Sequence, residues 1–151
     1  MIVYIRYLNM GNQSSIQRVN FEDMQHIMKH HTSYTIINTL DINLQECLIP
    51  YTININSEES TINNLISTNK AREIVIYGKN ANDTTMYDKY EQLVKFGFTN
   101  VYIYPGGMFE WLCLQDIYSD ELFPTNKKEL DILKYKPHTQ LNKLYIMDNI
   151  D

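Results

Sequence analysis

The fold is decided by residues 73–111, which read EIVIYGKNANDTTMYDKYEQLVKFGFTNVYIYPGGMFEW. An apolar strand at 74–77 leads into a polar loop at 78–83, and an amphipathic helix follows at 84–96. After a glycine stop, a second apolar strand at 101–104 opens into another helix. Two βα units in succession, each with a strand that is apolar throughout, predict a parallel sheet covered by helices on both faces.

The polar loop is the first candidate site. It lies between a buried strand and a helix N-terminus, where open α/β proteins place their chemistry. Its residues are Gly78, Lys79, Asn80, Ala81, Asn82 and Asp83. The loop contains no serine, threonine or cysteine, so the sequence predicts the scaffold of an active site without a nucleophile.

The residues before this stretch continue the α/β pattern. Asn20 is expected to cap a helix whose apolar face comprises Phe21, Met24, Ile27 and Met28. Strands are expected at 16–19, 34–37 and 52–55, and a further helix begins within 57–60. The chain is therefore expected to be α/β, with a central parallel sheet of about five strands.

Three segments are expected along the chain: an N-terminal arm at 1–15, one α/β domain at 16–124 and a C-terminal helical extension at 125–151. In the extension, Asn126 and Glu129 resemble a capping box that opens a last helix. The inward-facing residues of that helix are expected to be Leu130 and Leu133.

Composition narrows the classes of function. The 151 residues suffice for one domain with its own core. A net charge of -5 argues against a nucleic-acid partner, because phosphate contacts require clustered Lys and Arg. No apolar run reaches the length of a membrane span. Cys47 and Cys113 make no disulfide framework, which favours a reducing compartment such as the cytoplasm.

The segment Met-Gly-Asn-Gln-Ser-Ser at 10–15 matches the pattern for N-myristoylation. The modification requires translation to start at Met10, so that Gly11 becomes the N-terminal residue. The alternative reading is a polar linker. Membrane association is expected only if Gly11 carries the lipid.

Three histidines gather near the end of the helix that follows Asn20. His26 and His30 are four residues apart, a spacing that can hold a metal, and His31 follows directly. No acidic or cysteine partner lies close in sequence, so we read them as solvated side chains near a helix C-terminus. No metal and no cofactor are predicted.

The most specific motifs lie in the second half of the deciding stretch. Gly-Phe-Thr-Asn-Val-Tyr at 97–102 and Gly-Gly-Met-Phe-Glu-Trp at 106–111 resemble landmarks of the rhodanese family. Ile-Asn-Thr-Leu at 37–40 resembles the family's Ile-Asp-Val-Arg, and Cys-Leu-Ile-Pro-Tyr-Thr-Ile at 47–53 resembles its Gly-His-Ile-Pro-Gly-Ala-Ile. Residues 122–137 resemble an extension of rhodanese-like proteins from large DNA viruses and some protists. The resemblance implies a parallel sheet flanked by helices and transfer of sulfane sulfur through a cysteine persulfide.

This sequence departs from the family pattern at the positions that carry the family's sulfur-transfer chemistry. Gly78 stands where the family has its nucleophilic cysteine, and Asp83 stands where it has the arginine that holds an anionic substrate. Asn38 replaces an aspartate and Leu40 an arginine. A persulfide needs a thiolate in a cradle of backbone N–H groups, and Gly78 has no side chain. We therefore expect the rhodanese-like domain at 16–124 to have lost catalysis.

Three functions are compatible with these residues. The first is a non-catalytic protein-binding or structural module, in a scaffold or a virus particle, that lies in the cytoplasm (the host's if the protein is viral) and contacts a protein partner. The second is a sulfurtransferase or sulfur carrier that uses Cys47 or a partner's thiol. The third is a sensor that binds a small anion through the amides of the 78–83 loop. The oligomeric state is not predicted.

Overall fold

The computed structural model describes residues 15–141 and has a four-stranded, fully parallel sheet in the order β1-β4-β3-β2. The strands are β1 (Gln17–Arg18), β2 (Tyr34–Asn38), β3 (Glu73–Tyr77) and β4 (Val101–Tyr104). β2 pairs with β3 over its whole length, and β3 in turn pairs with β4. The prediction of an α/β fold with a central parallel sheet is confirmed.

The expected fifth strand is reduced to a single parallel bridge between Ile36 and Thr52. The reason is that helix α3 (Ile55–Thr68) begins earlier than its predicted start within 57–60. The Asn54 side chain accepts a hydrogen bond from the Asn56 N–H, which caps this helix and ends the extended backbone.

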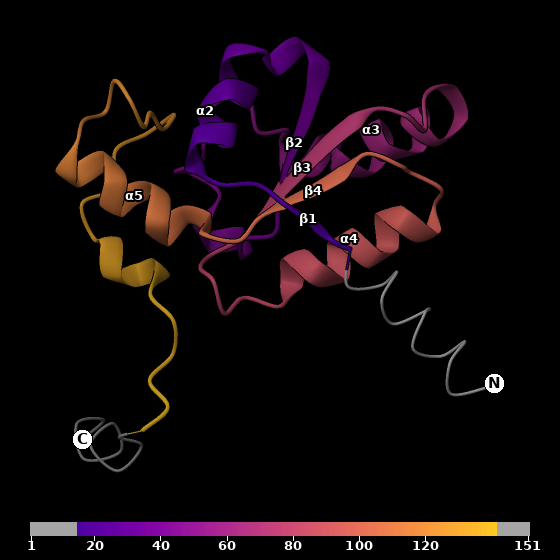
Figure 1. Cartoon of the computed structure of the whole chain (residues 1–151). Helices are drawn as coiled ribbons and strands as arrows, with labels where there is room; N and C mark the ends of the chain where they lie inside the picture. The colour runs from indigo at the N-terminus through magenta and orange to yellow at the C-terminus, as the bar shows by residue number, and fades with distance from the viewer. Residues whose placement is uncertain (1–14, 142–151) are drawn as a thin grey trace.

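Helices cover both faces of the sheet, as predicted (Figure 1). On one face α2 (Phe21–Lys29) and α5 (Gly107–Ile117) enclose a core with Met24, Ile36, Val75, Tyr104 and Trp111. On the other face α3 and α4 (Thr85–Lys95) enclose a core with Ile37, Ile62, Ile76, Met86 and Leu93. Short 3₁₀ turns lie at His31–Ser33, Ile42–Leu44 and Ile132–Tyr135. No helix within residues 15–141 is long and apolar enough to cross a membrane.

Two predicted helix boundaries are confirmed in detail. Asn20 and Asp23 form a reciprocal capping box at the start of α2. Gly97 ends α4 with φ of 100°, and the N–H groups of Gly97 and Phe98 donate to Val94 and Leu93 in a Schellman motif. Met86 and Leu93 of this amphipathic helix are buried, whereas its Val94 is 45% exposed.

The helix predicted to begin at Asn126 is absent, and the described part of the extension contains only the 3₁₀ turn η3 (Ile132–Tyr135). Asn126 does not cap a helix, because its side chain accepts a hydrogen bond from the Leu48 N–H while its own N–H donates to the Leu48 carbonyl. Leu130 and Leu133, expected to face inward, are 83% and 65% exposed. Residues 1–14 and 142–151 lie outside the described part of the chain, and with them the lipidation motif at Gly11.

Candidate functional site

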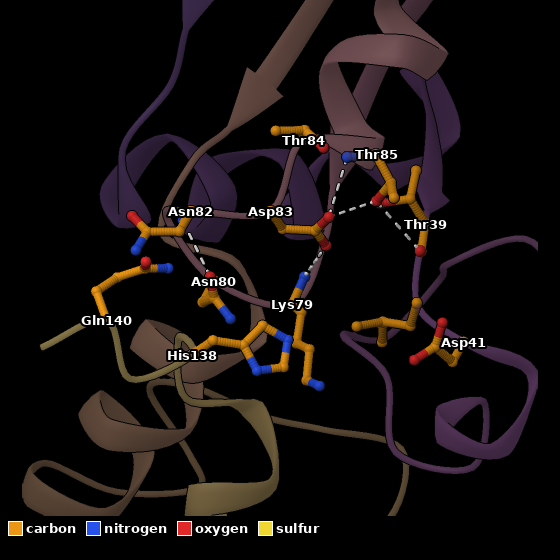
Figure 2. A pocket seen from close by; sticks show the side chains of 11 residues that line it. Thr39, Asp41, Lys79, Asn80, Asn82, Asp83, Thr84, Thr85, His138 and Gln140 are labelled. Atoms are coloured by element: carbon orange, nitrogen blue, oxygen red, sulfur yellow. Dashed lines mark hydrogen bonds between the residues drawn. The ribbon is translucent and has the colours of Figure 1, made fainter. Parts of the chain in front are cut away.

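The 78–83 loop follows β3 at the carboxyl edge of the sheet and leads into α4. It borders a pocket of about 340 Å³. Figure 2 shows that the other walls come from Thr39 and Asp41, which follow β2, and from His138 and Gln140 of the C-terminal segment. The structure therefore brings three distant parts of the chain together around the loop singled out in the sequence.

The position expected for a nucleophile is filled by another side chain. Gly78 is buried, and a Cβ atom placed on it would lie 2.5 Å from Asp83 Oδ2 and 2.9 Å from Thr39 Oγ1. A real Cβ essentially never approaches an oxygen atom that closely. Any side chain at residue 78, cysteine included, therefore requires the Asp83 carboxylate to move.

The Asp83 carboxylate is held in place by three donors. Oδ2 accepts the Lys79 N–H at 2.9 Å, and Oδ1 accepts the Thr85 N–H at 3.0 Å and the Thr85 hydroxyl at 2.7 Å. The Thr85 and Thr39 hydroxyl oxygens lie 2.9 Å apart, which ties the loop to the end of β2. Asp83 thus caps the first turn of α4, and its negative charge suits that helix N-terminus.

The loop also packs closely on the start of α5. The N–H groups of Met108 and Phe109 donate to the carbonyls of Gly78 and Lys79 at 3.0 and 2.9 Å. Gly107 has φ of 64°, and a Cβ on it would lie 2.7 Å from the Gly78 carbonyl oxygen. These amides of α5 therefore bind the loop itself, in the region where a helix N-terminus would otherwise receive an anion.

Asn80 connects the loop to the C-terminal segment. It is buried, its Nδ2 donates to the Tyr135 carbonyl at 2.9 Å, and its Oδ1 accepts the Asn82 N–H at 2.9 Å. Tyr135 is 1% exposed and belongs to the core, where burial raises the pKa of its hydroxyl to about 12. The extension therefore docks on the domain through Tyr135. The remaining loop residues, Ala81 and Asn82, are exposed.

A protein-family model for the rhodanese-like domain matches residues 21–113, which is more than half of the chain. The chain belongs to the rhodanese-like domain family. A search of curated proteins gave no match.

Solved structures agree with this fold. The chain is similar to the rhodanese-like domain of an Anabaena sp. protein, with 19% identity, a TM-score of 0.52 and coverage of 82% of this chain and 86% of that one. A single-domain sulfurtransferase of Saccharomyces cerevisiae is 18% identical, with a TM-score of 0.53 over 69% of this chain and 94% of that one. A Bacillus halodurans protein is 18% identical, with a TM-score of 0.54 over 73% and 80%. At these identities the likeness establishes the fold alone.

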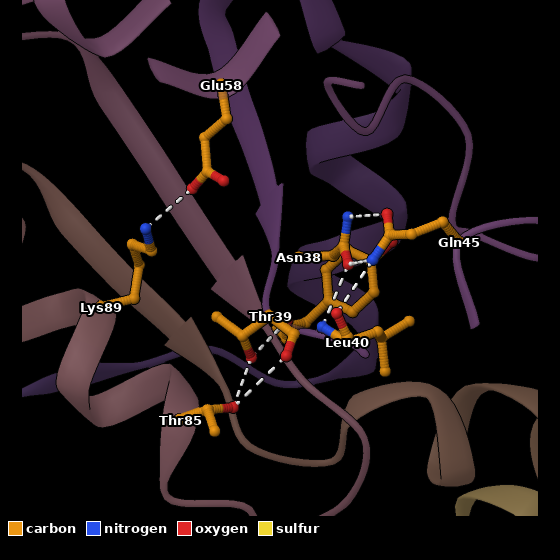
Figure 3. A network of polar contacts seen from close by, with 8 residues as sticks. Asn38, Thr39, Leu40, Gln45, Glu58, Thr85 and Lys89 are labelled. Atoms are coloured by element: carbon orange, nitrogen blue, oxygen red, sulfur yellow. Dashed lines mark hydrogen bonds and ion pairs between the residues drawn. The ribbon is translucent and has the colours of Figure 1, made fainter. Parts of the chain in front are cut away.

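In this rhodanese-like domain the end of β2 carries a neutral amide pair (Figure 3). Asn38 Nδ2 donates to Gln45 Oε1 at 3.1 Å, and Gln45 Nε2 donates to Asn38 Oδ1 at 2.8 Å. The Leu40 N–H also donates to Asn38 Oδ1, and the Leu40 side chain is buried. At these two positions the departures therefore leave uncharged side chains, and the polar groups of Asn38 are hydrogen-bonded within the turn. Sequence reasoning missed Gln45 because nothing local marks its pairing with a residue seven positions away.

Neither cysteine of the rhodanese-like domain lines the pocket. Cys47 is 4% exposed, its Sγ donates to the Lys127 carbonyl at 3.1 Å, and burial raises the pKa of its thiol. Cys113 is half-buried in α5, and burial raises its thiol pKa too. Both groups are therefore protonated at neutral pH, whereas a nucleophilic cysteine has a lowered pKa and access to its substrate.

None of the three histidines at the end of α2 lines the pocket beside the loop. The rings of His26 and His30 are 4.2 Å apart, and His30 Nδ1 lies 2.9 Å from the His26 carbonyl oxygen. Over residues 15–141, no group of three or more His, Cys, Asp or Glu side chains is arranged to hold a metal ion.

Proposed function

We propose that this rhodanese-like domain is not a catalyst and acts as a protein-binding or structural module. One observation carries the proposal: Asp83 Oδ2 lies 2.5 Å from the point where a Cβ of residue 78 would be. The site lacks the thiol, and the space for the thiol is taken by a carboxylate with three hydrogen-bond donors.

The electrostatics of the pocket support the same conclusion. Sulfur donors such as thiosulfate are anions, and a persulfide forms when a thiolate attacks the donor's sulfur. Two carboxylates, Asp41 and Asp83, line the pocket, and the Lys79 N–H already donates to Asp83. The Lys79 side chain also lines the pocket, so two carboxylates stand against one ammonium group, and an anionic donor meets a net negative charge there.

The test is a thiosulfate–cyanide turnover assay on the full chain, run beside the Cys47→Ser and Cys113→Ser variants. We expect all three proteins to give the rate of the protein-free reaction. Turnover by the wild type that disappears in Cys47→Ser would replace the proposal with a sulfurtransferase that uses Cys47.

A binding role is supported by the described part of the C-terminal extension. Leu130, Leu133 and Leu141 are 83%, 65% and 99% exposed, so this short segment presents three large apolar side chains to solvent. We propose that this segment contacts a protein partner. Cross-linking mass spectrometry in the native source should give partner cross-links at the neighbouring Lys128 and Lys134, and cross-links confined to the chain itself would contradict the proposal.

We propose that the protein resides in a reducing cytoplasm. If the resemblance of residues 122–137 to viral proteins reflects the origin of the chain, the location is a virus particle and the cytoplasm of its host. Cys47 and Cys113 are both free thiols, which supports a reducing compartment. Fractionation of the native source should recover the protein with both thiols reduced, and recovery of oxidised protein from an extracellular fraction would contradict this setting.

A further inference from the structure

Tyr51 has an uncommon backbone conformation. Its φ is 69°, and within residues 15–141 it is the only residue other than glycine with positive φ. The left-handed region is unfavourable for a residue with a Cβ. The same turn resembles the family's Gly-His-Ile-Pro-Gly motif, with tyrosine where that motif has its second glycine. A large aromatic side chain is therefore displayed at a position where glycine would be less strained.

The Tyr51 ring is displayed as part of a flat platform. It stacks on the His31 ring with centroids 3.7 Å apart and planes inclined by 6°. Tyr51 nevertheless remains 59% exposed, since His31 covers only one face of the ring. The stack fixes the orientation of the aromatic surface, which lowers the entropy lost when a ligand packs on it.

The platform forms one wall of a groove of about 560 Å³ between α2 and the segment after α5. Met28, Leu122 and two prolines supply its apolar surface. Lys29, His31 and Tyr51 bring hydrogen-bond donor groups to the same lining, and Glu121 brings one carboxylate. Gln25 Nε2 donates to the Leu122 carbonyl at 2.9 Å, so α2 and the Leu122 segment are tied across it.

We propose that this groove, the Tyr51 groove, binds a proline-containing extended segment of a partner protein. Such a segment has no internal hydrogen bonds, so its carbonyls need external donors, and its proline rings pack well on aromatic faces. The groove offers both a stacked aromatic platform and hydrogen-bond donor groups. A nucleic-acid base could also stack there, but the net charge of -5 disfavours that class of partner. The inference rests on the proposed binding role and names its surface.

The experiment uses an array of short synthetic peptides that contain a Pro-x-x-Pro core with acidic, basic or neutral flanks. Each peptide is paired with a version in which the prolines are replaced by alanine. The full chain, Tyr51→Asn and Ile42→Asn are applied to the array, and affinities are then measured in solution. Asparagine tolerates positive φ, so Tyr51→Asn removes the ring while keeping the turn. Ile42 is 75% exposed and lies outside the groove, which makes it the matched control.

We expect the wild type and Ile42→Asn to bind a subset of the proline peptides and not their alanine versions. Tyr51→Asn should lose affinity by at least about tenfold, the effect of removing a central aromatic anchor, and its melting temperature should not fall, because asparagine tolerates the positive φ. No binding, binding that survives Tyr51→Asn, or equal binding of the alanine peptides would overturn the inference. Self-association lost in Tyr51→Asn would also overturn it, because the occupant would then be a second copy. These outcomes are independent of the turnover assay, so the peptide-binding proposal can be wrong while the non-catalytic role is still supported.

Discussion

Replacing Gly78 with alanine tests whether the Asp83 carboxylate holds the space of the missing nucleophile. The added Cβ would lie 2.5 Å from Asp83 Oδ2, so the carboxylate must move away. It would then lose the Lys79 N–H and weaken its contacts with the Thr85 N–H and hydroxyl. Thr39 Oγ1, at 2.9 Å, belongs to a side chain that can rotate away at small cost.

The size of the effect follows from those bonds. Hydrogen bonds to a charged group contribute about 1.5–3 kcal/mol each, and loss of a helix-capping side chain costs about 0.5–2 kcal/mol. Because Asp83 is half-buried, water replaces part of what is lost, so we expect Gly78→Ala to cost about 2 kcal/mol. With Asp83→Ala already present only the Thr39 hydroxyl has to rotate away, and the same substitution should change stability by less than about 0.5 kcal/mol.

The assay is urea unfolding of the wild type, the two single variants and the double variant, followed by circular dichroism at neutral pH. The four free energies give a coupling of about 2 kcal/mol between residues 78 and 83. Thermal unfolding should agree, at about 2–4 °C per kcal/mol for a chain of this length. Equal costs of Gly78→Ala in both backgrounds would refute the account, because the carboxylate would then not be what occupies the space.

Other perturbations test the remaining contacts. Asn80→Ala removes the hydrogen bond to the Tyr135 carbonyl and should lower the free energy of unfolding by about 1–3 kcal/mol. Trypsin should then cleave the extension faster, and unchanged cleavage would show that this hydrogen bond does not hold the extension in place. Gly97→Ala places a Cβ at φ of 100° and should cost about 1–2 kcal/mol in urea unfolding, and a neutral result would refute the left-handed assignment. Burial raises the Cys47 thiol pKa from 9.0, so the unfolded chain loses this proton at a lower pH than the folded chain does. The free energy of unfolding should therefore fall as pH rises above about 9. Urea unfolding at about pH 8 and pH 10 should show a smaller fall in Cys47→Ser, and an identical fall would assign the effect to other groups.

The sequence predicted those parts of the fold that depend on local signals. The apolar runs of β3 and β4 mark buried parallel strands whatever the rest of the chain does. The capping box at Asn20 and the left-handed Gly97 are also set by neighbouring residues. For the same reason the loop at 78–83 could be located from its flanking strand and helix.

The sequence did not predict features that depend on distant partners. Asn126 has a local capping signal, yet its hydrogen bonds with Leu48 hold the segment in another conformation. The sequence showed that the end of β2 lacks the charged residues typical of the family. It did not show that the Gln45 amide pairs with Asn38 there, because no local sequence pattern indicates that contact. The departure at Asp83 was visible in the sequence, whereas its position over Gly78 follows from how the loop folds.

The central claim is that this rhodanese-like domain forms no persulfide. The most direct measurement is the intact mass of the full chain after incubation with thiosulfate, beside an active single-domain sulfurtransferase as positive control. We expect the control to gain one sulfur atom and this chain to keep its mass, because residue 78 has no thiol and the Cys47 thiol is buried and protonated. A gain of one sulfur atom that maps to Cys47 and is absent in Cys47→Ser would contradict it.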